Sequence, residues 1–360
     1  MDLLNIIDIQ PYSLNKSKKR ELLTKRLQAL TVHHYNNCEA YKKILTVSGI
    51  DINHLPEYDK LPFLPVRLFK EIELRSIIKN DVIKTLTSSG TTGQQVSKIF
   101  LDKNAASNQT KVLTKIVSSL IGTKRCPMIL LDSSNVIKNR SMFSARGAGI
   151  LGFSIYGSKK IYAFNHEMHL DIETVQTFLC EHSSETIFMF GFTFIIWQYF
   201  YKELLNSGYK PTLSNAILIH GGGWKKLTTQ AVSYKDFKDG LHNVCGINQN
   251  NIHDYYGMVE QTGTIHLECE KGYLHTSIFS DILIRRHKDF SLANYGERGI
   301  IEVVSVLPES YPGHILLTED EGEIIGEDDC SCGRLGKYFK VYGRIKGAEI
   351  RGCSDTYEKR

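Results

Sequence analysis

Long hydrophobic runs are absent from this chain of 360 residues. A membrane-spanning helix needs about 18 or more consecutive apolar residues, and the apolar stretch at residues 187–197 is too short. The N-terminal residues also lack the basic, apolar and small-residue order of a secretory signal. We therefore expect a cytoplasmic protein with no membrane span. Its eight cysteines should be reduced and available for metal binding or nucleophilic chemistry.

A strong charge of one sign is absent as well. Lys and Arg number 44, Asp and Glu number 39, and the formal net charge of +5 is small for this length. The basic residues are spread along the chain, and the short cluster Lys16–Arg20 fits the solvated start of a helix. Nucleic-acid-binding proteins usually gather positive charge in a patch or stripe, so we expect no nucleic-acid partner.

Two familiar catalytic signatures are missing. A Walker-type phosphate loop requires Gly-Lys-Ser/Thr after its spacer, but Gly93 is followed by Gln94. The glycines after His220 could form the oxyanion loop of an α/β-hydrolase, which would also need a Gly-x-Ser-x-Gly nucleophile elbow. The sequence has no such elbow, so that class of hydrolase is excluded.

The chain does contain an alternation of short β runs and helical patterns. Residues 15–47 carry leucines at helical spacing and predict a helix, and prolines then mark an extended segment that ends near Phe69. Further strands are predicted at residues 129–131, 186–190 and 216–219, with helices at 171–182 and 194–206. The last third predicts strands at 278–284, 299–306 and 313–318. This order indicates an α/β fold with a parallel sheet, followed by a β-rich subdomain.

A dense cluster of hydroxyls and glycines follows the β-prone run 82–87. It consists of Ser88, Ser89, Gly90, Thr91, Thr92 and Gly93, with Lys98 a little beyond. Backbone N–H groups and hydroxyls in such a loop can converge on phosphate oxygens, so the cluster suggests a nucleoside triphosphate. Taken alone, it is equally compatible with an ordinary surface loop.

Two later clusters add to this signal. The first consists of Gly221, Gly222 and Gly223 after a predicted strand, where the backbone could lie against a flat ligand such as adenine. The second contains Tyr256, Gly257 and Glu260. The Glu260 carboxylate could hold Mg²⁺, which prefers oxygen ligands and keeps few protein contacts. A structural turn with a surface glutamate would explain the second cluster if it stood alone.

A fourth constellation has the residue types of a metal site. Cys269 and His275 lie at one glycine-containing turn, and Cys330 and Cys332 lie at another about 55 residues later. Three thiolates and one imidazole match a tetrahedral structural Zn²⁺ site. The metal would then join two distant turns of the β-rich subdomain. The alternative is a set of unrelated reduced cysteines and a surface histidine.

Taken in order, these clusters resemble the signature segments of the adenylate-forming superfamily of acyl- and aryl-CoA ligases, luciferases and adenylation domains. Residues 89–93 look like its phosphate loop, residues 221–223 like its adenine-side turn, and residues 256–260 like its Tyr-Gly-x-Thr-Glu motif. Val259 replaces the usual Thr, which removes one hydroxyl and leaves Glu260 as the expected Mg²⁺ contact.

Two more segments extend the resemblance toward the end of the chain. Residues 318–320 look like the family's Thr-Gly-Asp, in which Asp320 would bind the ribose hydroxyls. Arg344 looks like the arginine before the family's hinge. The resemblance implies an α/β fold, the large N-terminal body of an adenylate-forming enzyme. It would have a helical leader and a β-rich subdomain, with the C-terminal domain essentially missing.

Within the superfamily the chain most resembles the LuxE-like acyl-protein synthetases, near the phenylacetate-CoA-ligase-like branch. The resemblance is carried by residues 33–38, 88–93 and 221–225 and by Gly352-Cys353. It implies that ATP and Mg²⁺ activate a carboxylic acid, a fatty acid in this family, to an acyl-adenylate. The acyl group would then move to the chain's own Cys353 and pass to an acyl reductase partner of the LuxC type.

The residues around Cys353 fit an acyl acceptor. Arg344, Lys346 and Arg351 would favour the thiolate, which is the reactive form of cysteine. The alternative is an incidental thiol in the tail. The chain ends where a CoA ligase would begin the domain that carries its catalytic lysine, and Lys346 or a partner's lysine could substitute. An acyl- or aryl-CoA ligase of the same fold and a non-catalytic zinc-containing scaffold protein remain as alternatives.

The predicted elements, the motifs and the resemblance together divide the chain into four expected parts. They are a helical leader (residues 1–80), an α/β adenylate-forming core (81–265), a β-rich subdomain with the zinc residues (266–343), and a short tail with the acyl-accepting cysteine (344–360).

Overall fold

The computed structural model describes residues 2–88, 96–138, 145–224 and 231–345, and these residues form two compact units. The first unit contains residues 2–88, 96–119 and 257–345, and the second contains 120–138, 145–224 and 231–256. The units do not follow chain order, because the chain leaves the first unit after residue 119 and returns to it at residue 257.

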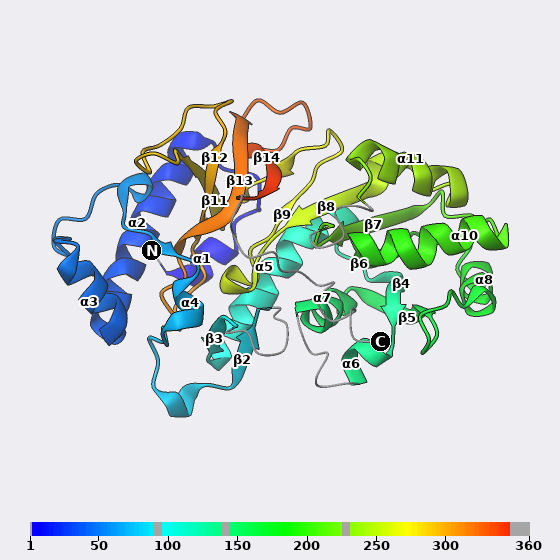
Figure 1. Ribbon diagram of the computed structural model, residues 1–360, viewed down its shortest axis with the longest axis horizontal. Helices are drawn as coiled ribbons and strands as arrows, with labels where there is room; N and C mark the ends of the chain where they lie inside the picture. Colours follow the sequence, from blue (N-terminus) through cyan, green and yellow to red (C-terminus); the bar gives the residue numbers. More distant parts are fainter. Residues whose placement is uncertain (1, 89–95, 139–144, 225–230, 346–360) are drawn as a thin grey trace. The chain divides into compact units, whose positions relative to one another are not determined.

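The second unit is built on a parallel sheet of order β5-β4-β6-β7-β8 (Figure 1). Its strands are β4 (Cys126–Ser133), β5 (Gly157–Phe164), β6 (Ile187–Phe192), β7 (Ala216–Gly221) and β8 (Ile252–Tyr256). Strands β4, β6 and β7 are buried along nearly their whole length, as expected for strands that are covered on both faces. The three strands predicted in this region are therefore confirmed.

Helices and turns connect these strands. They are α6 (Asn135–Lys138), α7 (Ala145–Ser154), α8 (Ile172–Glu181), α9 (Thr193–Ile195), the π-helical segment η4 (Ile196–Tyr201), α10 (Lys202–Ser207), α11 (Tyr234–Cys245) and the short turn η6 (Gln249–Asn251). The helix predicted at 194–206 is thus present, with a wider π turn in its middle. Helix α8 also agrees with its prediction, and Asp171 caps its first turn by accepting from the Thr174 N–H.

The first unit is rich in antiparallel strands. Its main sheet has the order β10-β14-β13-β12-β11, with β1 paired in parallel to β13. The strands are β1 (Leu64–Pro65), β10 (Leu274–His275), β11 (Ser280–Arg285), β12 (Gly299–Ser305), β13 (Ile315–Glu327) and β14 (Lys337–Arg344). A separate antiparallel hairpin is formed by β2 (Lys84–Thr87) and β3 (Lys98–Leu101). The predicted β-rich character of this region is confirmed.

Helices and short turns complete the first unit. The helices are α1 (Leu3–Ile7), α2 (Lys16–Asn37), α3 (Glu39–Val47), α4 (Leu68–Glu71) and α5 (Lys103–Ile121). The short turns are η1 (Tyr58–Lys60), η2 (Lys79–Asp81) and η7 (Val259–Gln261), and β9 (His266–Leu267) is a two-residue strand.

The prediction of one continuous helix over residues 15–47 was wrong in one respect. The chain leaves the helical conformation at Cys38, where φ is −129° and ψ is 103°, so two helices form instead of one. Cys38 is buried and separates the two apolar faces. Helical spacing of leucines continues through this break, and for that reason the spacing alone could not reveal it.

Buried histidines join helix α2 to the main sheet of the first unit. The His34 Nδ1 lies 2.7 Å from the Ser76 hydroxyl, and its Nε2 lies 3.1 Å from the Pro308 carbonyl. His314 Nε2 lies 3.0 Å from the Thr31 hydroxyl. Burial, with the neighbouring His314, lowers the pKa of His34 well below its usual value, and burial with nearby Arg26 lowers the pKa of His314 to about 3. Both imidazoles are therefore neutral in the folded protein.

This arrangement predicts acid destabilisation. Each histidine titrates near pH 6.5 when unfolded, so its contribution to stability is complete above about pH 6.5 and is lost as the pH falls toward the folded-state pKa. Because of His314, the unfolding free energy should therefore fall by about 1.4 kcal/mol for each pH unit below about pH 6.5. In urea unfolding between pH 7 and 4.5, the unfolding free energy of His314→Gln should fall less steeply with decreasing pH than that of wild type, by about this amount per pH unit. The exposed His54 supplies the control His54→Gln, and an unchanged slope in His314→Gln would contradict the prediction.

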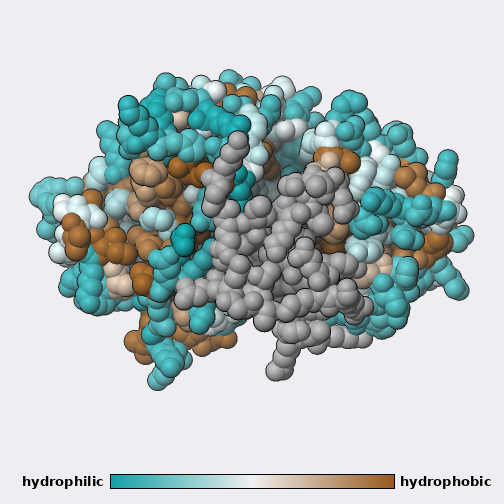
Figure 2. All heavy atoms as spheres, viewed as in Figure 1, coloured by the Kyte–Doolittle hydropathy of each residue, from teal (hydrophilic) through white to brown (hydrophobic). Residues whose placement is uncertain are grey.

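Within the described ranges, no helix is long and apolar enough to cross a membrane. The face drawn in Figure 2 is mostly hydrophilic, with hydrophobic residues scattered over it.

Candidate functional site

The β2–β3 hairpin of the first unit carries the predicted phosphate loop. The Ser88 N–H donates to the Ser97 carbonyl (3.2 Å), and the Ser97 N–H donates to the Ser88 hydroxyl (2.9 Å). These two bonds close the base of the loop. Its remaining predicted residues, Ser89, Gly90, Thr91, Thr92 and Gly93, lie outside the described residues. Lys98 begins β3 and is exposed.

Glu260 lies in the turn η7 of the same unit and is only 5% exposed. Burial raises the pKa of its carboxyl group, while the Ser97 hydroxyl and the positive charges of Lys70 and Arg344 act in the opposite direction. The Tyr311 hydroxyl donates to the Glu260 carbonyl at 2.9 Å and so fixes the backbone of this turn. The nearby positive charges therefore favour the ionised form of this buried carboxyl group.

Asp320 and Arg344 lie opposite each other on the adjacent strands β13 and β14. Arg344 Nε is 3.7 Å from Asp320 Oδ1, and Arg344 Nη1 donates to Glu319 Oε2 at 3.1 Å. The Thr318 hydroxyl accepts from the Asp320 N–H at 3.1 Å. The predicted ribose carboxylate and the predicted arginine are therefore brought together by strand register.

The glycine turn belongs to the second unit. Gly221 is the last residue of β7, and a Cβ added there would come within 2.6 Å of the Tyr255 ring, so only glycine fits. Gly222 and Gly223 have φ values of 89° and 54°, which favour glycine. The chain thus turns sharply at the end of the strand, with its backbone bare of side chains.

Two predicted residues of the cluster that contains Glu260 are Tyr256, which ends β8, and Gly257, at which the chain returns to the first unit. His220, the residue before Gly221, points inward, because its Nδ1 lies 2.9 Å from the Thr193 hydroxyl. Burial lowers the pKa of His220 to about 3.

A buried ion pair fixes the C-terminal edge of β4 in the same unit. Arg146 of α7 donates from Nε and Nη2 to the two oxygens of Asp132, at 2.7 Å and 2.6 Å. Both residues are almost fully buried. We did not predict this pair from the sequence, since neither residue belongs to a recognisable motif. The same is true, in the first unit, of Ser97 and of Tyr311, whose hydroxyl donates to the Glu260 carbonyl from a distant part of the chain.

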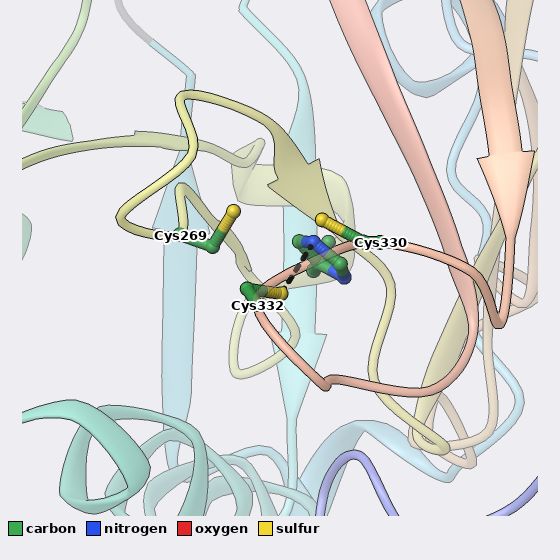
Figure 3. Close-up of side chains that lie close together, drawn as sticks. Cys269, Cys330 and Cys332 are labelled. Atoms are coloured by element: carbon green, nitrogen blue, oxygen red, sulfur yellow. Dashed lines mark hydrogen bonds between the residues drawn. The ribbon is translucent and has the colours of Figure 1, made fainter.

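The four metal-type residues lie together in the first unit. The sulfurs of Cys269, Cys330 and Cys332 and a ring nitrogen of His275 all lie within 4.8 Å of one another. Figure 3 shows the three sulfurs directed toward one another, and its dashed line marks the 3.4 Å contact between Cys332 Sγ and His275 Nε2. His275 is fully buried, which argues against the interpretation of a surface histidine.

The local backbone and electrostatics of this cluster suit metal ligands. The Lys271 N–H donates to Cys269 Sγ (3.4 Å), and the Arg334 N–H donates to Cys332 Sγ (3.5 Å). These N–H groups favour thiolate sulfur. Burial, with the charge of Arg334, lowers the pKa of His275 to about 4, so its imidazole is neutral, the form that binds metals.

The remaining predicted catalytic residues, Cys353 and Lys346, lie outside the described residues.

The fold places this chain in a known structural class. A crystal structure of 2-hydroxyisobutyryl-CoA ligase, in complex with 2-HIB-AMP and CoA in the thioesterification state, superposes with a TM-score of 0.70 at 14% identity. The match covers 93% of this chain and 70% of that chain. An open conformation of the same ligase gives a TM-score of 0.70 at 12% identity, over 94% of this chain and 77% of that one. The fold is thus the α/β body of an adenylate-forming ligase, as predicted.

The sequence itself identifies a particular family within this fold class. The chain belongs to the acyl-protein synthetase (LuxE) family, whose sequence model matches residues 2–360. It is therefore an adenylate-forming acid–thiol ligase. A long-chain-fatty-acid–luciferin-component ligase of Aliivibrio fischeri is 21% identical over 379 aligned positions, which cover 98% of this chain and 92% of that protein. A ligase of the same name from Photorhabdus luminescens is 34% identical over 61 residues, 17% of this chain and 52% of that protein.

Proposed function

We propose that this chain uses ATP to activate a carboxylic acid, of the fatty-acid class named for its relative, and transfers the acyl group to its own Cys353. The observation that carries the proposal is the family match over residues 2–360. Within the first unit, the closed base of the Ser88–Ser97 hairpin and the buried carboxyl group of Glu260 support this proposal.

The proposed reaction has two steps. A carboxylate oxygen of the acid attacks the α-phosphorus of ATP, and the bond from that phosphorus to the bridging oxygen breaks to release pyrophosphate. The Cys353 thiolate then attacks the acyl carbon, forming a thioester while AMP leaves. Hydroxyls and N–H groups of the 88–93 loop would bind the phosphates, where negative charge grows.

The nucleoside would be held by other residues. Asp320 would accept hydrogen bonds from the ribose hydroxyls, with Arg344 holding its side chain in place. Gly221–Gly223, Tyr256 and Gly257 are further candidate nucleotide contacts, proposed from the sequence resemblance. Lys98 is a candidate phosphate contact, and Lys346 is a candidate substitute for the catalytic lysine of the CoA ligases.

A divalent cation fits Glu260. Its carboxyl group is buried and its pKa is raised by burial, so a bound cation would favour the ionised form. Mg²⁺ typically takes only one or two protein carboxylates and completes its shell with phosphate and water. When bound, Mg²⁺ would neutralise charge on the phosphates.

We also propose that Cys269, His275, Cys330 and Cys332 hold a structural Zn²⁺. The donor set of three sulfurs and one nitrogen leaves no open position for a substrate, which is the pattern of structural zinc sites.

The test of the proposed activity is the mass of the intact protein after incubation with ATP, Mg²⁺ and a panel of carboxylic acids. We expect a single added acyl group, with the loss of one water, for the preferred acid, and radiolabel exchange between pyrophosphate and ATP that depends on the same acid. Consumption of added CoA, with no acyl-protein formed, would instead identify a CoA ligase. No ATP binding by calorimetry would identify a scaffold protein. Adding a purified acyl reductase of the type found with this family should discharge the thioester.

A further inference from the structure

The segment of residues 64–71 contacts two parts of the first unit that carry candidate nucleotide-binding residues. Strand β1 pairs in parallel with Leu316 and Leu317 of β13, and the Val66 N–H donates to the Leu317 carbonyl at 2.9 Å. The next residues of β13 are Thr318, Glu319 and Asp320. Segment 64–71 therefore enters beside the predicted ribose site and continues into the short helix α4.

Helix α4 is fixed against the Glu260 turn. The Phe69 ring packs edge-on against the Tyr311 ring, with centroids 6.0 Å apart and planes at 87°. The same Tyr311 donates its hydroxyl hydrogen bond to the Glu260 carbonyl. Helix α4 also packs against β3, the strand that follows Ser97 (Figure 1). The contacts of α4 with Tyr311 and with β3 thus hold this helix next to the phosphate hairpin and the turn that carries Glu260.

Lys70 follows Phe69 directly and is half-buried. Its positive charge is close enough to Glu260 to favour the ionised form of that carboxylate, as does Arg344. Arg67, one turn earlier, differs: its side chain is 72% exposed and pairs with Glu71. Of these two cations on one short segment, Lys70 is the less exposed, it directly follows the Phe69 that packs against Tyr311, and its charge acts on Glu260.

We propose that Lys70 is a catalytic residue of the adenylation step, whose ammonium group contacts the phosphates of ATP beside Glu260. This inference rests on the proposed function. No motif pointed to Lys70, because its position depends on the pairing of β1 with β13 and on the contact between Phe69 and Tyr311.

The chemistry of the step explains why a cation is useful there. As the acid oxygen bonds to the α-phosphorus, the electron pair of the breaking bond moves to the bridging oxygen, and the departing pyrophosphate gains negative charge. An ammonium group offers three N–H donors and a full positive charge, and it need not lose a proton for the step to proceed. A fixed donor of this kind stabilises the charge that develops in the transition state.

The test compares Lys70→Met with Arg67→Met. Each removes one positive charge from the same segment and keeps an unbranched side chain of similar length. We expect the acid-dependent exchange between pyrophosphate and ATP to fall by about 10²-fold or more in Lys70→Met, the loss typical of one transition-state donor. The exchange should stay within about twofold of wild type in Arg67→Met. Lys70→Arg should recover part of the lost rate, since it restores the charge with a different geometry.

The outcomes separate this inference from the proposed function. If the wild-type chain shows exchange and Lys70→Met exchanges equally well, Lys70 has no such role. An equal loss in Arg67→Met and Lys70→Met would show an effect of the helix or of net charge, and would also overturn the inference. A melting temperature of Lys70→Met close to that of wild type would show that the loss is not caused by unfolding. If the wild-type chain exchanges with no acid in the panel, the proposed function itself fails.

Discussion

Replacing Cys353 by alanine should abolish the acyl-protein adduct while acid-dependent exchange between pyrophosphate and ATP persists. The first step of the proposed reaction involves only the acid and ATP, so it does not require this sulfur. The second step does, because only a thiolate can form the thioester. In the presence of ATP, Mg²⁺ and the preferred radiolabelled acid, the variant should carry less than about 1% of the wild-type label, whereas the exchange rate should remain within a few-fold of wild type.

A matched control is available on the same chain. Cys180 is exposed in helix α8 of the second unit, so Cys180→Ala removes an accessible thiol that has no proposed role. It should keep both the adduct and the exchange. Peptide mapping of the wild-type adduct should place the label on the peptide that contains Cys353. Label that persists in Cys353→Ala, or that maps to another cysteine, would refute the assignment of the acceptor.

The strands were the most predictable part of the fold. The runs at 129–131, 187–190 and 216–219 are continuous apolar segments with glycine or polar turns at their ends, and they form the buried centre of the parallel sheet. Their signal is local, because a strand that is covered on both faces must be apolar along its length. The break at Cys38 could not be predicted in this way, since the residues on both sides keep a helical pattern.

The candidate site was predictable only where its residues form motifs. Glycines at 221–223 and Glu260 were found because their spacing is distinctive. Ser97, Tyr311 and Lys70 were missed, although each lies close to Glu260 or supports it. Tyr311 is about 50 residues away from Glu260 in sequence, and a hydrogen bond to a backbone carbonyl leaves no pattern in the amino acids. Tertiary contacts of this kind follow from strand order, which the sequence does not show directly.

The Cys/His cluster is an intermediate case. Its residue types indicated a metal, but the sequence could not show that the two pairs meet. The antiparallel pairing of β10 with β14 brings them together, because His275 lies opposite Tyr338, just after the turn that carries Cys330 and Cys332. The N-terminal segment joins the same region, where the Leu335 N–H donates to the Tyr12 carbonyl and the Tyr12 ring packs edge-on against His275.

Loss of the proposed zinc should destabilise the first unit strongly. The cluster joins the turn at Cys269, strand β10 and the turn before β14, and β14 leads directly to Arg344. Without a metal, the three sulfurs and the His275 ring nitrogen would remain within 4.8 Å of one another with no ion to bind them. Because metal binding of this kind is coupled to folding, we expect Cys269→Ser and Cys332→Ser to lose about 4 kcal/mol or more of unfolding free energy. This corresponds to a fall of about 8–16 °C in melting temperature.

Two measurements and a control variant check this prediction. Elemental analysis of the wild-type protein should find one equivalent of zinc per chain, and the two variants should contain almost none. A strong chelator should lower the melting temperature of the wild type toward that of the variants and should change the variants little. Cys126→Ser is the control, since Cys126 is a half-buried cysteine in the second unit. A wild-type protein that is purified without metal, takes up none from added zinc, and melts at the same temperature as Cys332→Ser would show that the four residues are not a metal site.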